Sequence, residues 1–145
     1  YGSLAKEDPT RFKPCGCMAH ARRKIIDAWD HQPTQSKELV LQLRRLYVIE
    51  KHAREESLTA DQRCQLRQQM AVPILAQLKE RLLALQPAVL PQSPLGKAVN
   101  YALAEWEPLN RYLEDGRLEI DNNLTYAERG ITAVMPLLDL CRVAA

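Results

Sequence analysis

The chain has 145 residues, 46% of them apolar, and its 20 basic and 18 acidic side chains leave a net charge of +2. A chain of this length is expected to form one domain with its own core. The apolar content is too high for a disordered chain, and no apolar run reaches the roughly 18 residues of a membrane-spanning helix. No secretory signal is visible. Four cysteines are too few for a disulfide scaffold and favour reduced thiols in the cytoplasm.

The first third of the chain predicts a short strand and then a helix. Residues 11–15 have the composition of a strand, which Pro14 restricts to a sheet edge or a strand end. From Cys17 onward the pattern is helical, and the dipeptide before Pro33 ends it. One helix face collects the apolar residues Met18, Ala21, Ile25, Ala28 and Trp29.

The middle of the chain predicts two long helices. Ser36 is a candidate N-cap for a helix that runs to about Glu56. Thr59 and Gln62 have the spacing of a capping box and predict the start of the next helix. Because a proline inside a helix removes a hydrogen bond and clashes with the preceding turn, we expect a kink or a break at Pro73.

The last third predicts shorter elements. Residues 87–94 are rich in proline and predict a loop, after which Ser93 and the proline that follows it start a helix. Pro108 is expected to interrupt that helix, and residues 109–113 to add another turn or two. Residues 118–120 are expected to be extended. The sequence therefore predicts a mainly α-helical chain with about five or six helices and at most two short strands.

Two clusters could bind metal ions. Cys15, Cys17 and His20 are potential soft-metal ligands within one short segment, but a zinc site needs four ligands, usually in two pairs, so the bland interpretation as small residues between a strand and a helix is favoured. Asp121 and Glu128 would share a face if the segment were helical, and two carboxylates could bind a divalent ion. Turn and cap chemistry is the favoured local interpretation there.

Three consecutive cations, Arg22, Arg23 and Lys24, occupy the first turns of a predicted helix. Cations are unfavourable near a helix N-terminus unless an anion lies nearby. A solvated face is the ordinary interpretation, and a phosphate-binding role is the functional one. The sequence contains no phosphate-binding glycine motif and no visible hydrolase triad.

Several segments of the sequence are informative when they are read together. They are G-C-M-A-H-A-R-R-K (16–24), L-Y-V-I-E (46–50), P-Q-S-P-L-G-K-A-V-N-Y-A-L (91–103), Trp106 with R-Y-L (111–113), and D-G-R-L-E-I-D-N-N (115–123) followed by A-E-R (127–129). In order and at compatible spacing, these segments resemble the insertion-sequence-66 transposases, and the resemblance covers roughly residues 12–129.

The resemblance implies a DNA transposase with an RNase H-like core, in which two aspartates and a glutamate hold two divalent ions such as Mg²⁺. A helical insertion lies between the second aspartate and the glutamate of that core. The expected fold class is therefore mainly α: a helical insertion with one or two short edge strands from an incomplete RNase H-like core. Residues 1–35 and 114–145 are expected to border that core, and residues 36–113 to form the insertion.

The resemblance also assigns site residues. Glu128 matches the catalytic, metal-binding glutamate, and Arg129 matches an arginine that is a candidate phosphate contact. Arg22, Arg23 and Lys24 match a basic helix start, which is expected to contact the DNA backbone rather than read bases. The resemblance implies DNA as the partner, with no small-molecule substrate. An unpaired strand edge or an exposed apolar patch of the incomplete core predicts self-association, and the lack of a long apolar run predicts no membrane partner.

The sequence departs from the family pattern at three places. Neither catalytic aspartate is matched, and the chain begins at Tyr1, so we expect a piece of a longer protein. Residues 124–126 replace what is typically one residue, and two extra helical residues would turn Glu128 by about 200°. Residues 130–145 carry one arginine, no lysine and no aromatic residue, as in a truncated or frame-shifted end.

These departures predict a transposase fragment that is inactive by itself. The alternative is a non-enzymatic helical module that binds DNA or another protein. Salt-dependent DNA binding would favour that module.

Overall fold

The computed structural model describes residues 16–121, which form helices and connecting turns without a β-strand in that range. The predicted mainly α-helical fold is therefore confirmed for this part of the chain. In chain order the elements are α2 (Met18–Asp27), α3 (Pro33–Glu55), α4 (Ala60–Leu66), the π-helical turn η1 (Arg67–Ala71), α5 (Val72–Leu85), the 3-10 turn η2 (Gln86–Ala88), α6 (Pro94–Ala104), α7 (Trp106–Asn110) and the 3-10 turn η3 (Arg111–Leu113).

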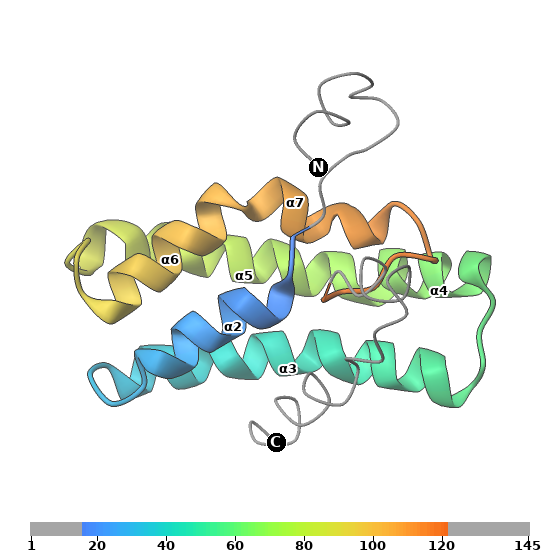
Figure 1. Ribbon diagram of the computed structural model, residues 1–145, viewed down its shortest axis with the longest axis horizontal. Coiled ribbons are helices and arrows are strands. Elements are labelled where there is room, and N and C mark those ends of the chain that lie inside the picture. The colour runs from blue at the N-terminus through green and yellow to red at the C-terminus, as the bar shows by residue number, and fades with distance from the viewer. Residues whose placement is uncertain (1–15, 122–145) are drawn as a thin grey trace, which may run out of the picture.

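Four helices surround one core. Helix α3 and the continuous α4–η1–α5 segment form a long hairpin, and α6 returns along α5 (Figure 1). Helix α2 packs against α3 and α6, and α5 packs against the same two helices, so α2 and α5 lie diagonally across the bundle. Helix α2, from the start of the described range, therefore packs against α6, from its last third.

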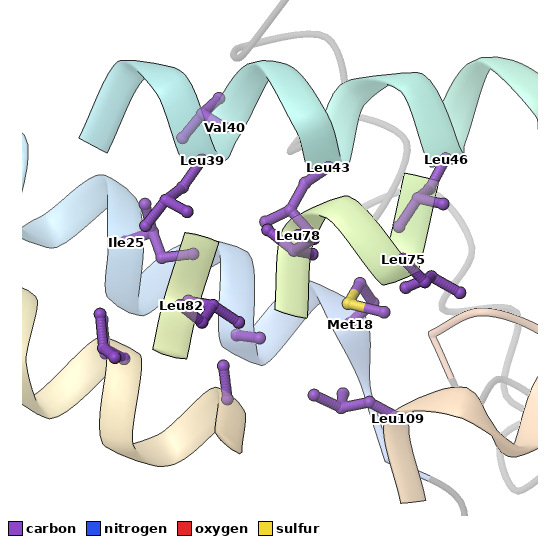
Figure 2. Packing of buried hydrophobic residues seen from close by; sticks show 14 of the residues in the cluster. Met18, Ile25, Leu39, Val40, Leu43, Leu46, Leu75, Leu78, Leu82 and Leu109 are labelled. Carbon is purple, nitrogen blue, oxygen red and sulfur yellow. The ribbon is translucent and has the colours of Figure 1, made fainter. Parts of the chain in front are cut away.

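Leucines at helical spacing build this core, as an amphipathic pattern predicts. Figure 2 shows leucines of α3 directed toward leucines of α5, with side chains of α2 filling the space beside them. The labelled core residues are Met18, Ile25, Leu39, Val40, Leu43, Leu46, Leu75, Leu78, Leu82 and Leu109, and every one is buried. The same cluster extends to Ile120. The predicted boundaries near residues 35 and 113 stay predictions.

Two of the three predicted helix N-caps, Thr59 and Ser93, are confirmed. The Gln62 backbone N–H donates to the Thr59 hydroxyl at 3.2 Å, and the Thr59 N–H donates to the Gln62 side chain at 2.9 Å. The Gly96 N–H donates to the Ser93 hydroxyl at 3.1 Å, with a proline at the first helical position. These bonds satisfy backbone donors that a helix start leaves free.

Two helix boundaries differ from the expectation. The predicted N-cap Ser36 is wrong, because α3 begins at Pro33 and Ser36 is buried inside the helix. The fixed backbone angle of proline suits the first helical position, so the helix starts at Pro33 and not after Ser36. The interruption of the last long helix falls at Glu105, three residues before Pro108, which lies within α7.

The expected kink or break at Pro73 takes the form of a π-helical turn. The N–H of Val72 bonds to the carbonyl of Arg67, five residues back. The wider turn accommodates Pro73, which has no N–H to donate, and α5 then continues from Val72. The helix therefore changes its hydrogen-bond pattern before Pro73 without ending.

The RNase H-like edge strands are not present in the described range. Residues 118–120, expected to be extended, form a bend and a turn. Their carbonyls have other partners: that of Leu118 accepts from Arg67, and that of Ile120 accepts from the backbone of Met18. The candidate strand at residues 11–15 lies outside the described residues. No helix within residues 16–121 is long and apolar enough to cross a membrane.

Candidate nucleic-acid interface

The three consecutive cations of α2 have different environments. Arg22 is 3% exposed, and its guanidinium lies over the ring of Tyr47 in α3, 5.2 Å from the centroid. Lys24 is exposed, and its ammonium lies over the ring of Tyr101 in α6 at 4.9 Å. Arg23, between them, is exposed to solvent. The first cation thus packs inside the fold, and the next two are accessible to a ligand.

The N-terminus of α2 is capped by Asp121. Oδ1 of Asp121 accepts hydrogen bonds from the backbone N–H of Ala19 at 2.9 Å and from the hydroxyl of Tyr47 at 2.6 Å. A carboxylate there satisfies an orphan N–H and favours the positive end of the helix dipole. The Asp121 carboxyl group therefore lies at the helix start where the three cations of α2 favour an acidic partner.

Asp121 is almost completely buried. Burial is the largest influence on its pKa and raises it, while the hydrogen bonds from Tyr47 and Ala19 and the charge of Arg22 oppose that rise. Both hydrogen bonds go to the same oxygen, and they connect α2, α3 and the last described residue.

Arg67 organises the turn that leads to Asp121. The side chain is fully buried at the start of η1, and its guanidinium bonds both carboxylate oxygens of Glu50 in α3, from Nη2 at 2.6 Å and from Nε at 3.1 Å. Such a two-point contact is among the stronger ion pairs in proteins. Because Glu50 is also buried, neither charge has access to bulk water.

The remaining Arg67 donors hold backbone carbonyls. Nη1 donates to the carbonyls of Tyr112 at 2.6 Å and Asp115 at 3.2 Å, and Nη2 donates to that of Leu118 at 2.9 Å. The guanidinium also lies over the Tyr112 ring at 4.8 Å. The Tyr112 hydroxyl is buried, and this burial raises its pKa. One arginine thus fixes the backbone from the end of η3 to the bend before Asp121.

The same turn is closely packed against α4. A β-carbon at Gly116 would collide with the carbonyl oxygen of Ala60, so this position requires glycine. Asp115 accepts from the backbone and the side chain of Arg117, and these contacts lower the pKa of Asp115 to about 2. Asp115 and Arg117 thus stabilise the turn by bonding to each other.

The predicted metal-site residues are not brought together in the described part. Glu128 and Arg129 lie outside it, as does Cys15. Within residues 16–121 no three histidine, cysteine or acidic side chains gather where they could hold a metal ion. Cys17 is a free thiol and His20 is exposed. Oδ1 of Asp121 accepts from Ala19 and Tyr47.

Sequence reasoning missed Glu50 and Arg67, although both are central to this region. Glu50 belongs to the L-Y-V-I-E segment, whose resemblance to the family was its only signal. Arg67 carried no signal, because a single arginine in a polar helix segment resembles a surface residue. Its partners lie 17 to 51 residues away in the sequence.

These contacts join the segments on which the sequence resemblance rested, namely the basic helix start, L-Y-V-I-E and the D-G-R-L-E-I-D turn. A family model described as "Transposase IS66 family" matches residues 1–135. The chain belongs to this transposase family.

The similar curated proteins are uncharacterized proteins of Sinorhizobium fredii (strain NBRC 101917 / NGR234). Protein y4jD is 40% identical over 139 residues, which are 92% of this chain and 26% of that protein. Protein y4qI is 35% identical over 117 residues, which are 80% of this chain and 21% of that protein. The chain therefore spans about a quarter of the length of these relatives. No solved structure matches it.

Proposed function

We propose that this chain is the helical part of a DDE transposase, which cleaves and transfers DNA strands during transposition of an insertion sequence in the cytoplasm. Residues 16–121 would serve as a scaffold that presents a basic helix to DNA and leads the chain toward Glu128. The observation that carries this proposal is the capping of α2 by Asp121. It joins the basic helix to the segment that continues toward Glu128.

Exposed cations support the DNA contact. Arg23 and Lys24 are accessible to a phosphate, whereas Arg22 is buried against Tyr47 and would support the helix from beneath. Backbone contacts by arginine and lysine position a protein on DNA without reading its sequence. Arg129 is proposed as a further phosphate contact.

Glu128 is proposed as the catalytic glutamate and as a ligand of Mg²⁺. A complete active site of this type would hold two such ions, which stabilise the attacking and leaving oxygens of phosphodiester transfer. One glutamate cannot hold two ions, and the family's two aspartates are not matched in this sequence. We therefore expect no strand cleavage by these 145 residues alone.

The alternative is a non-enzymatic helical module that binds DNA or another protein, including a second copy of the chain. The exposure of Arg23 and Lys24 favours its DNA-binding form, because these side chains are presented without any contribution from Glu128. Both functions therefore predict DNA binding, and they differ in what Glu128 does.

The first test is DNA binding by the 145-residue chain, measured by fluorescence anisotropy of a labelled duplex at several salt concentrations. We expect the affinity to fall with salt, because phosphate contacts release counterions. Arg23→Gln with Lys24→Gln should weaken binding, and the exposed cation Lys79 of α5 offers a control as Lys79→Gln. Unchanged binding by the α2 double variant would contradict the DNA contact.

The second test separates the two functions. In a longer transposase chain that carries this segment and both aspartates, Glu128→Gln should abolish Mg²⁺-dependent strand cleavage and leave DNA affinity nearly unchanged. Cleavage that survives this substitution would exclude Glu128 as the metal-binding glutamate and leave the binding module.

A further inference from the structure

We infer that the surface for duplex DNA is not confined to α2 but spans three helices. This inference rests on the proposed function and extends its site to α3 and α6. The four residues that define this three-helix basic face are Arg44 of α3, Arg23 and Lys24 of α2, and Lys97 of α6, all of them exposed.

The two cation–π contacts of α2 fix the faces that its neighbours present. Arg22 lies over Tyr47, and Arg44 is three residues before that tyrosine. Lys24 lies over Tyr101, and Lys97 is four residues before it. Residues three or four apart share one face of a helix. Arg44 and Lys97 therefore border α2 from opposite sides.

The face has a size suited to a nucleic-acid backbone. Helix α2 packs directly on α3 and on α6, and packed helix axes are about 8–10 Å apart. Because α3 and α6 both pack on α2 and on α5, they lie diagonally across the bundle, and that spacing puts their axes about 11–14 Å apart, roughly three to four times the 3.4 Å between successive charges of one DNA strand along the axis. One duplex could contact cations from all three helices.

These four cations are available for phosphate. Within residues 16–121 no carboxylate lies within ion-pair distance of them, whereas the neighbouring Lys51 is 3.8 Å from Glu55. Asp27, one turn beyond Arg23, is the exposed acidic group of α2 on the same side. It should repel a phosphate backbone and oppose binding.

The aromatic residues of this face favour duplex over single-stranded DNA. Single-strand binding sites combine a basic groove with aromatic rings on which bases stack. The rings of Tyr47 and Tyr101 are already occupied by Arg22 and Lys24. At these two tyrosines the face thus presents charge over the rings, which suits the outside of a duplex.

The experiment uses the 145-residue chain and a labelled duplex, with the dissociation constant measured from low to moderate salt. Arg44→Gln and Lys97→Gln should each lower the slope of log affinity against log salt by about 0.9, the value for one lost phosphate contact. Asp27→Asn should raise the affinity. Lys79→Gln on α5, diagonally opposite α2, is the matched control and should change nothing. Thermal melting of each variant verifies that it is folded.

The outcomes separate this inference from the proposed function. If Arg23→Gln and Lys24→Gln weaken binding while Arg44→Gln and Lys97→Gln behave like Lys79→Gln, the three-helix face is wrong and the α2 contact stands. If Lys79→Gln weakens binding as much as the others, the attraction is a general charge effect and the face is also wrong. If the unsubstituted chain shows no salt-dependent binding, both fail. A single-stranded competitor that binds more tightly than the duplex would overturn the choice of ligand.

Discussion

Two arginine–glutamate pairs connect α3 to the antiparallel segment beside it, and their surroundings differ sharply. Glu50 and Arg67 meet at 2.6 Å with side chains 3% and 0% exposed, whereas Glu38 and Arg81 meet at 2.9 Å with side chains 44% and 40% exposed. Arg67 also holds three backbone carbonyls of the turn before Asp121. The same pairing thus fixes the buried turn before Asp121 at one place and lies on the surface at the other.

The largest expected effect comes from breaking the buried pair. Arg67→Met leaves Glu50 as a buried charge without its partner, which costs about 3–5 kcal/mol. The free energy of unfolding from urea titration measures this loss. If Arg67→Met costs no more than a surface substitution, the buried network is not what stabilises the turn.

A double substitution separates the contribution of the ion pair from that of the carbonyl contacts of Arg67. Arg67→Met with Glu50→Leu removes both charges, and replacing a buried ion pair with apolar residues is often neutral. Here the recovery should be incomplete, because the carbonyls of Tyr112, Asp115 and Leu118 lose their donor. Buried unsatisfied polar groups cost about 1–3 kcal/mol each. Full recovery would mean that the carbonyl contacts contribute nothing.

The contrast between local and distant contacts explains what the sequence could predict. The caps at Thr59 and Ser93 were predicted because each donor and acceptor are three residues apart. The bond between Asp121 and Ala19 spans 102 residues, so no local pattern indicates it. The expected strand at residues 118–120 was wrong for the same reason, since Arg67 and the start of α2 bind its carbonyls in place of a neighbouring strand. The spacing of the leucines predicted the core. The polar network could not be predicted, because its partners come together only in the folded chain.

Gly116 tests the packing of the turn that Arg67 holds. In Gly116→Ala the added methyl group would meet the carbonyl of Ala60, and the turn or the start of α4 must shift. Overpacking of this kind costs about 1–3 kcal/mol. Urea titration measures the loss, and hydrogen exchange should show weaker protection around residues 112–121. An unchanged protein would mean that the turn moves freely despite its contacts.

The contribution of Asp121, at the other end of that turn, is expected to make the free energy of unfolding depend on pH. Because burial raises the pKa of Asp121, the folded chain binds a proton more readily than the unfolded chain. The stability that this group contributes is therefore fully present below pH 3.8, the ordinary aspartate pKa, and is lost as the pH rises through the raised value. Asp121→Asn keeps an acceptor for Ala19 and Tyr47 but does not titrate.

The measurement is the free energy of unfolding of both proteins from acid to neutral pH. Relative to Asp121→Asn, the unsubstituted chain should lose stability as the pH rises from 3.8, the ordinary pKa of the group. Asp121→Ala, which lacks an acceptor, should be less stable than Asp121→Asn throughout. A constant difference between the unsubstituted chain and Asp121→Asn across this range would refute the raised pKa.

The exposed pair should give the smallest effect and complete the comparison. Arg81→Gln removes an ion pair whose partners are both accessible to water, and such pairs contribute about 0–1 kcal/mol because water and salt screen them. Added salt should shrink the effect of Arg81→Gln further and leave that of Arg67→Met nearly unchanged, because screening acts weakly on buried charges. The two variants, titrated with urea at low and high salt, thus separate burial from pair chemistry. If both variants lost the same free energy of unfolding, neither the burial of Arg67 nor its carbonyl contacts would account for its contribution to stability.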